Sequence, residues 1–179
     1  MAFLAAEVES VLRGRPPVVA DVPRLQYVER VLLEGMRLYP PTWIFVRVPL
    51  RDDVLPGGFR VPAGSKLYLS PYATHRNARY FPDPNRFDPD RFTETARKAR
   101  PPMAYFPFAV GPRACLGQAF ALLEGVLVLA SLSQRVRLEL MPGPPVLPLP
   151  RQTLAPRNGI WMEVRPRDVA SAPAARQGA

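Results

Sequence analysis

The chain has 179 residues and a formal net charge of +9, and 24 of its residues are proline, well above the usual share of about 5%. Its 11 glycines follow no triplet period, which excludes collagen, and an apolar share of 47% argues against a disordered chain. The single cysteine, Cys115, excludes an internal disulfide and makes a reducing compartment the default expectation. What remains is a globular chain of about one domain whose helices must lie between its prolines.

Three proline-free windows, residues 1–15, 24–39 and 113–141, are the helix candidates, because proline inside a helix removes a hydrogen bond and clashes with the preceding turn. In the second window apolar residues recur every three or four positions, and Asp21 is predicted to be the N-cap. Gly35 lies inside this helix and suggests that another element packs closely there. No window is apolar enough for a membrane span, and the acidic N-terminus lacks the start of a secretory signal. We therefore expect a cytoplasmic protein with no membrane anchor in this chain.

Short segments rich in aromatic and β-branched residues predict strands at 43–50, 59–62 and 66–72, and later at 135–140 and 159–165. Prolines at several of their ends restrict the strands to edges, so the sheet should be small. The fold class expected is mainly α with a small β-sheet (α+β).

The stretch from residue 77 to residue 112 has no helical or strand period beyond a short turn. A long irregular stretch inside a compact domain usually has a function. The residues after 167 are small and polar, so a single folded unit at 1–167 and a disordered tail at 168–179 are expected.

The cysteine lies just before the third helix window, in the segment Phe108-Ala109-Val110-Gly111-Pro112-Arg113-Ala114-Cys115-Leu116-Gly117. A helix N-terminus and the nearby Arg113 both favour the thiolate form of Cys115. Gly111 and Gly117 allow the backbone to turn tightly and to approach the sulfur or a flat ligand. The sequence therefore predicts a nucleophile or a metal ligand, although a lone cysteine is most often a small buried residue.

The other ionisable residues decide between these chemistries. A nucleophile needs a base, and the only histidine is His75, which no motif pairs with Cys115. A zinc site would need more cysteine and histidine ligands than the chain has. A single thiolate fits haem, whose macrocycle fills the other positions around the metal.

The chain resembles the C-terminal part of the cytochromes P-450, the haem-thiolate monooxygenases. Residues 108–117 match the family's Phe-x-x-Gly-x-Arg-x-Cys-x-Gly at every fixed position. Glu34 and Arg37 match the Glu-x-x-Arg of its K helix, and residues 89–92 match its Pro-Glu-Arg-Phe with Asp90 in place of Glu. The three motifs follow the family's order. The resemblance covers residues 1 to about 167, from the J and K helices through the long irregular meander and the Cys-ligand loop to the L helix.

This resemblance implies haem b as the cofactor, with Cys115 as the axial ligand of its iron and the only residue of the chain that takes part in catalysis. The cofactor-binding residues would be Arg47, Phe108, Gly111, Arg113, Cys115 and Gly117, with the two arginines pairing with the propionates. A buried structural triad would consist of Glu34, Arg37 and Arg91. An apolar substrate pocket would include Thr42, Trp43, Ile44, Phe45, Thr153 and Leu154. We expect His75 to hydrogen-bond within the loop that follows Tyr72.

The function implied is hydroxylation of an apolar substrate with O2, with a ferredoxin, flavodoxin or reductase as electron donor. An acidic donor protein would dock on basic residues, with candidates Arg97, Lys98, Arg100 and Arg113. Nucleic acid is not expected as a partner, because the arginines are scattered and form no stripe with aromatic residues. The family's distal oxygen-activating helix and earlier helices have no counterpart here, so the resemblance implies a fragment. The alternative is a catalytically inactive haem-binding remnant or half of a split protein.

Overall fold

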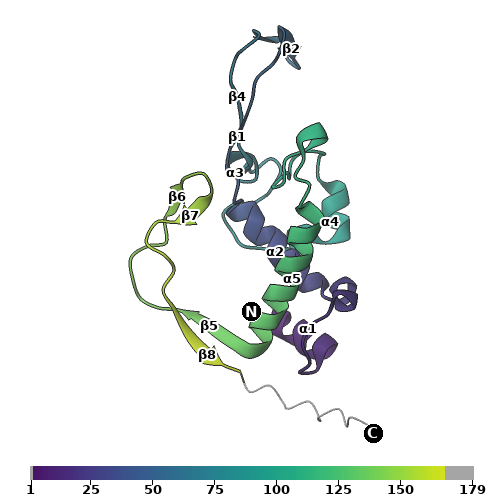
Figure 1. Ribbon diagram of the computed structural model, residues 1–179, viewed down its shortest axis with the longest axis vertical. Helices are drawn as coiled ribbons and strands as arrows, with labels where there is room; N and C mark the ends of the chain where they lie inside the picture. Colours follow the sequence, from purple (N-terminus) through teal and green to yellow (C-terminus); the bar gives the residue numbers. More distant parts are fainter. Residues whose placement is uncertain (1, 168–179) are drawn as a thin grey trace.

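The computed structural model describes residues 2–167, and the tail predicted at 168–179 lies outside the described residues. Three longer helices, α1 (Ala2–Leu12), α2 (Gln26–Leu38) and α5 (Gln118–Arg135), fall within the three proline-free windows. They pack together, and the strand pairs project from them (Figure 1). The prediction of an α+β chain is confirmed. Among the described residues no helix is long and apolar enough to cross a membrane.

The strands form four separate antiparallel pairs in the described part of the chain, in place of the one small sheet expected. These pairs are β1 (Phe45–Arg47) with β4 (Leu67–Leu69), β2 (Asp53–Leu55) with β3 (Phe59–Val61), β5 (Val136–Leu140) with β8 (Met162–Pro166), and β6 (Pro148–Pro150) with β7 (Leu154–Pro156). Each of the five predicted segments overlaps one of these strands. The other three, β2, β6 and β7, were not predicted, and both β6 and β7 contain prolines, which argue against strands in a sequence.

The stretch from 77 to 112 is largely irregular, as expected, and is interrupted only by short helices. Between residues 2 and 167 the short helices are η1 (Val19–Arg24), α3 (Pro71–Thr74), η2 (Pro89–Phe92), α4 (Glu94–Ala99) and η3 (Gly111–Arg113). This irregular stretch joins α3 to the cysteine-containing loop before α5. It therefore separates the second and third long helices by a long segment with little regular hydrogen bonding.

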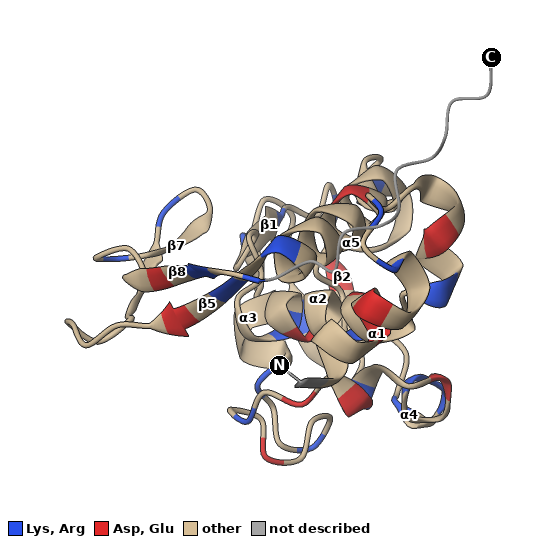
Figure 2. Cartoon of the chain, turned by 90° about the horizontal axis from the view of Figure 1, so that it is seen from below, with Lys and Arg blue, Asp and Glu red and all other residues tan. Residues whose placement is uncertain are grey.

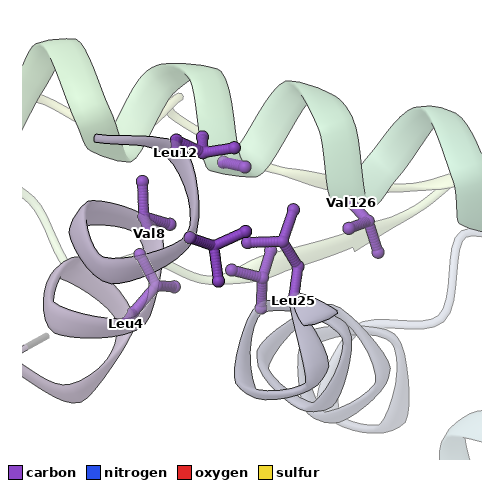
Figure 3. Packing of buried hydrophobic residues seen from close by; sticks show 8 residues of the cluster. Leu4, Val8, Leu12, Leu25 and Val126 are labelled. Atoms are coloured by element: carbon purple, nitrogen blue, oxygen red, sulfur yellow. The ribbon is translucent and has the colours of Figure 1, made fainter. Parts of the chain in front are cut away.

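The hydrophobic core lies where α1, α2 and α5 meet (Figure 3). Its buried members are Leu4, Val8, Val11, Leu12, Leu25, Val28, Val126 and Ala130. Those of α1 are spaced by three or four residues and so lie on one face of the helix. Burying a valine or leucine side chain fully stabilises the fold by about 1.5–3 kcal/mol, so this cluster fixes how the three helices pack.

The start of α2 is capped by a residue of α1. The prediction of Asp21 as the N-cap is wrong, because Asp21 lies within η1 and its carboxylate accepts the N–H of Val18 at 2.9 Å. The carboxylate of Glu7 instead accepts the backbone N–H groups of Tyr27 and Val28 at 2.8–2.9 Å. A negative charge at a helix N-terminus is stabilised by the helix dipole, so this contact holds α1 against the first turn of α2.

The close approach between helices occurs at Gly125 and not at Gly35. A Cβ atom on Gly125 would lie 2.6 Å from Cδ2 of Leu32, whereas a Cβ on Gly35 would meet nothing within 4 Å. The interpretation of Gly35 as a packing glycine is therefore wrong. Gly125 allows α5 to approach the Leu32 side chain of α2.

Gly35→Ala should raise the free energy of unfolding by about 0.5–1 kcal/mol, because alanine has the higher helix propensity and its Cβ meets open space. The same change at Gly125 adds a methyl group that overlaps Leu32, and such overpacking costs about 1–3 kcal/mol. Urea unfolding should therefore find Gly125→Ala less stable than Gly35→Ala by about 1–3 kcal/mol. Equal stability of the two variants would contradict the close packing of α2 and α5.

Candidate functional site

Cys115 lies on the wall of a cavity of about 370 Å³ between the end of α2, strand β1 and the loop that precedes α5. The cavity is lined by Met36, Pro41, Thr42, Phe45, Arg47, Pro107, Phe108, Ala109, Arg113 and Cys115. Most of these side chains are apolar, and the lining includes one thiol and two guanidinium groups. An apolar ligand that also carries negative charge matches this combination.

The loop that carries Cys115 folds back on itself through backbone hydrogen bonds. The N–H of Cys115 donates to the carbonyl of Phe108 at 2.9 Å, and the N–H of Ala109 donates to the carbonyl of Phe106 at 3.2 Å. Ala109 and Gly111 have positive φ angles of 58° and 72°. Glycine adopts this conformation freely, whereas for alanine it costs roughly 1–2 kcal/mol. The loop therefore holds strain at Ala109 while it presents the exposed thiol of Cys115.

Gly117 lies two residues after the cysteine and is the N-cap of α5. A Cβ on Gly117 would lie 3.8 Å from the Sγ of Cys115, which is an ordinary contact distance. Glycine here leaves free the space beside the sulfur. Cys115 itself lies three residues before the first helical residue, Gln118, whose N–H donates to the Cys115 carbonyl at 3.4 Å.

Arg47 and Arg113 reach the same cavity from elements far apart in the sequence, β1 and η3. The Arg47 guanidinium lies 5.1 Å from the centre of the Phe45 ring and donates to the carbonyl of Val46 at 3.0 Å. Across residues 2–167, neither arginine forms a salt bridge with a carboxylate. Because arginine binds carboxylates through two parallel N–H groups, this pair suits a ligand with acidic substituents.

Glu34 and Arg37 form an ion pair with no solvent-exposed side-chain surface. Arg37 donates Nε and Nη2 to the two carboxylate oxygens of Glu34 at 2.6 and 2.9 Å. Glu34 also accepts the backbone N–H of Asp88 at 2.8 Å. Arg91 lies nearby, with its Nε 3.7 Å from Oε1 of Glu34, and donates Nη2 to the carbonyl of Asp83 at 2.9 Å. The structure thus brings together the three residues of the predicted triad.

The remaining donors of Arg37 hold the irregular stretch. Its Nη1 donates to the carbonyls of His75 and Pro84 at 2.8 and 2.7 Å, and its Nη2 donates to that of Arg86 at 3.1 Å. Buried carbonyl groups need hydrogen-bond donors, and an irregular backbone supplies few of its own. Arg37 therefore fixes two points of this stretch, and the end of α3 just before it, to α2.

His75 is fully buried and is hydrogen-bonded to a distant part of the chain. Its Nε2 accepts the backbone N–H of Phe106 at 2.9 Å, and Phe106 lies in the irregular stretch that follows Tyr72, so the prediction of a hydrogen bond within that loop is confirmed. The rings of Tyr105, Phe106 and Phe81 lie 4.9, 5.3 and 6.3 Å from the imidazole, centre to centre. Burial, with a smaller contribution from nearby arginines, lowers the pKa of His75 to about 3. The ring is therefore neutral at pH 7.

The residues predicted for the substrate pocket divide into two groups. Thr42 and Phe45 line the cavity that contains Cys115. Trp43 donates its indole N–H to the carbonyl of Arg151 at 2.8 Å, and Leu154 donates its backbone N–H to the carbonyl of Pro41 at 2.9 Å. These two bonds hold the β6–β7 hairpin beside the segment that follows α2. Leu154 lines a second, apolar cavity of about 230 Å³, while Ile44 and Thr153 line neither.

The basic residues predicted to dock an electron donor have different surroundings. Arg97 lies 3.9 Å from Glu29, and Lys98 forms an exposed pair with Glu94 at 2.6 Å. Arg100 stacks between the rings of Phe81 and Phe92, at 4.5 and 4.9 Å, so it is not available for docking. Arg113 is exposed at the cavity. Lysine and arginine are spread over helices and hairpins alike in Figure 2, which agrees with the scattered pattern in the sequence.

Sequence reasoning missed three residues of the cavity wall. Met36 belongs to the apolar stripe of α2, and that stripe indicated only a buried face, not which of its members meets a ligand. Pro107 and Ala109 flank Phe108 in the cysteine motif. In the sequence, only their position beside Phe108 indicated that they could line the cavity.

Glu34→Ala should lower the free energy of unfolding by about 3–5 kcal/mol, because it leaves the Arg37 guanidinium buried without a carboxylate. The matched control is Glu94→Ala, which removes the carboxylate of the exposed pair with Lys98 and should cost less than about 1 kcal/mol. Denaturant unfolding followed by circular dichroism measures both losses. Equal losses in the two variants would contradict a buried, structurally required pair.

The stability of the chain should fall as the pH decreases from 6.5 toward 4.5. A histidine that stays neutral in the fold, with a pKa of about 3, takes up its proton only on unfolding at these pH values. The unfolding free energy should then decrease by up to about 1.4 kcal/mol per pH unit. Because His75 is the only histidine, His75→Gln should remove most of this slope. A variant that kept the full slope would show that another group causes it.

Comparisons with known proteins agree with these features. The family described as Cytochrome P450 matches residues 1–163. Cyclooctatin synthase of Streptomyces melanosporofaciens is 43% identical over 153 residues, 86% of this chain and 33% of that protein. Cytochrome P450 4V2 of Homo sapiens is 39% identical over 155 residues, 86% of this chain and 29% of that protein.

Solved structures share the arrangement of the elements. The heme domain of cytochrome P450DA superposes with a TM-score of 0.86 at 32% identity, covering 93% of this chain and 37% of that one. Retinoic acid-bound cyanobacterial CYP120A1 gives a TM-score of 0.87 at 28% identity, with 93% and 38% covered. The chain thus spans about a third of the length of the curated relatives it matches. A family match over most of its length, together with these similarities, shows that the chain belongs to the cytochrome P450 family.

Proposed function

We propose that this chain binds haem b through Cys115 and provides the thiolate side of a monooxygenase that hydroxylates an apolar substrate with O2. The observation that carries the proposal is the cavity in which Cys115, Arg47 and Arg113 share one largely apolar wall, in a chain of the cytochrome P450 family. Activity and substrate are attributed to the whole protein, because the relative cyclooctatin synthase is about three times as long as the region that matches this chain.

The residues present fit haem. The apolar wall, which includes Phe45 and Phe108, suits the faces of a porphyrin, and the exposed thiol of Cys115 offers one ligand to its metal. Arg47 and Arg113 supply two guanidinium groups for the two propionates. Gly111 has the positive φ angle that the loop requires, and Gly117 leaves space beside the sulfur. Each cofactor-binding residue expected from the sequence thus has a structural feature that supports its role.

The residues of the chain would have the following roles. When bound, haem supplies the activation of O2, and its thiolate ligand donates electron density to the metal. Phe108 lines the same cavity as Cys115 and would help to keep water from the sulfur when haem is bound, while the loop hydrogen bond from the Cys115 N–H to the Phe108 carbonyl fixes the position of the cysteine. The triad of Glu34, Arg37 and Arg91 holds the irregular stretch in place and has no part in the chemistry.

An apolar substrate is favoured by the walls of the site and by the names of relatives. Thr42 and Phe45 lie on the cavity, and Trp43, Ile44, Thr153 and Leu154 belong to the two adjacent segments joined by hydrogen bonds. Among the relatives are a cyclooctat-9-en-7-ol 5-monooxygenase and a carotene epsilon-monooxygenase. Electrons would come from a ferredoxin, flavodoxin or reductase that docks near the exposed Arg113.

Purified chain reconstituted with ferric haem, then reduced and exposed to CO, should give the strongly red-shifted Soret band of thiolate ligation. Cys115→Ala should lose that band because it removes the sulfur ligand. The matched control Leu116→Ala, at the fully exposed neighbouring side chain, should keep it. No haem uptake by the unaltered chain, or an unchanged band in Cys115→Ala, would refute the proposal. Haem uptake without turnover in the presence of a reductase would favour the haem-binding remnant over the enzyme.

A further inference from the structure

A continuous set of hydrogen bonds leads from the buried ion pair to the loop of Cys115, and His75 stands in its middle. Arg37, which is paired with Glu34, donates Nη1 to the carbonyl of His75 at 2.8 Å. The side chain of His75 accepts the backbone N–H of Phe106 at 2.9 Å. The backbone and the side chain of one residue thus connect the ion pair to the start of the cysteine loop.

From Phe106 the connection continues through the backbone. The Phe106 carbonyl accepts the N–H of Ala109 at 3.2 Å, and the carbonyl of Phe108 accepts the N–H of Cys115 at 2.9 Å. The ring of Phe106 also packs edge-on against Phe45, with centres 6.0 Å apart, and Phe45 lines the same cavity as Cys115. A shift of Phe106 would therefore move both the loop and one wall of the cavity.

The other ring nitrogen of His75 shows what this residue contributes. Since Nε2 accepts a hydrogen bond, the neutral ring carries its proton on Nδ1. Nδ1 is buried and has no partner among the residues described. An unpaired buried donor destabilises a fold. An aromatic side chain such as phenylalanine would fill the space without this cost, so packing alone does not explain a histidine here.

We propose that His75 is a positioning residue for Cys115. By accepting the Phe106 N–H, His75 links the loop that presents the sulfur to the buried Glu34–Arg37 pair and so restricts the movement of that loop. The proposal rests on the proposed function for the role of Cys115 as the haem ligand. In this proposal His75 fixes the geometry of the loop and does not contact haem or substrate.

Three variants distinguish the effect of the hydrogen-bond acceptor of His75 from the effect of its aromatic ring. His75→Phe keeps an aromatic ring and removes the acceptor, and His75→Gln replaces Nε2 by an amide oxygen at similar reach. Tyr105→Phe is the matched control, because Tyr105 packs on His75 and donates its hydroxyl to the carbonyl of Leu33 at 2.9 Å, away from the connection to Phe106. All three alter the same buried cluster.

Amide hydrogen exchange of the haem-free chain is the first measurement. In His75→Phe, exchange at the Phe106 and Cys115 N–H groups should be at least about tenfold faster relative to core amides of α1 and α2, because a buried donor has lost its partner. His75→Gln and Tyr105→Phe should leave this ratio within about threefold of the unaltered chain. Unchanged exchange at Cys115 in His75→Phe would overturn the proposal. If His75→Phe does not fold, His75→Asn, whose shorter amide falls short of Phe106, replaces it in the same comparison.

The reduced, CO-bound spectrum is the second measurement. His75→Phe should shift part of the red-shifted Soret band to shorter wavelength, as the sulfur is held less firmly as a thiolate ligand, and His75→Gln should restore it. A full red-shifted band in His75→Phe would overturn the proposal. Failure of the unaltered chain to take up haem would refute the proposed function alone, since the exchange rates report on the loop independently of haem.

Discussion

The buried ion pair of Glu34 and Arg37 is the interaction on which the rest of the structure depends. A buried ion pair contributes little net stability, because the desolvation of both charges opposes their attraction. Its importance here lies in the donors and acceptors that remain after the pair has formed. Arg37 still donates to three backbone carbonyls, and Glu34 still accepts the N–H of Asp88. A largely irregular segment is thereby held at several points, much as a strand is held by its neighbour.

Arginine side chains also supply hydrogen-bond donors that the backbone of this proline-rich chain lacks. Each proline keeps its carbonyl acceptor but lacks an N–H donor, so a chain with 24 prolines has more backbone acceptors than donors. Arginine offers five donors and accounts for all the basic residues except Lys66 and Lys98. Several arginines donate to main-chain carbonyls: Arg37 to Pro84, Arg15 to Pro16, and Arg100 to Arg91. Within the irregular stretch, Arg37, Arg91 and Arg100 thus supply side-chain donors to backbone carbonyls.

The sequence predicted well the features that depend on neighbouring residues, and it missed contacts between residues far apart in the chain. Gaps between prolines marked α1, α2 and α5, because a single proline is enough to end a helix. The cap of α2 by Glu7, the bond from Phe106 to His75 and the packing of Gly125 on Leu32 each join residues 20 or more positions apart. No periodicity within one segment contains such information. For the site, the motif around Cys115 indicated the loop but not the wall that faces it.

Strand geometry determines which residues of β1 can line the cavity wall opposite the cysteine loop. Side chains alternate between the two faces of a strand, so Phe45 and Arg47 share one face of β1 and Val46 points away. The structure agrees, since Phe45 and Arg47 line the cavity while Val46 is exposed. Trp43 and Ile44 precede β1 and do not line this cavity. Once Arg47 is assigned to the acidic edge of a ligand, the same alternation places Phe45 against that ligand's apolar face, and the two assignments support each other.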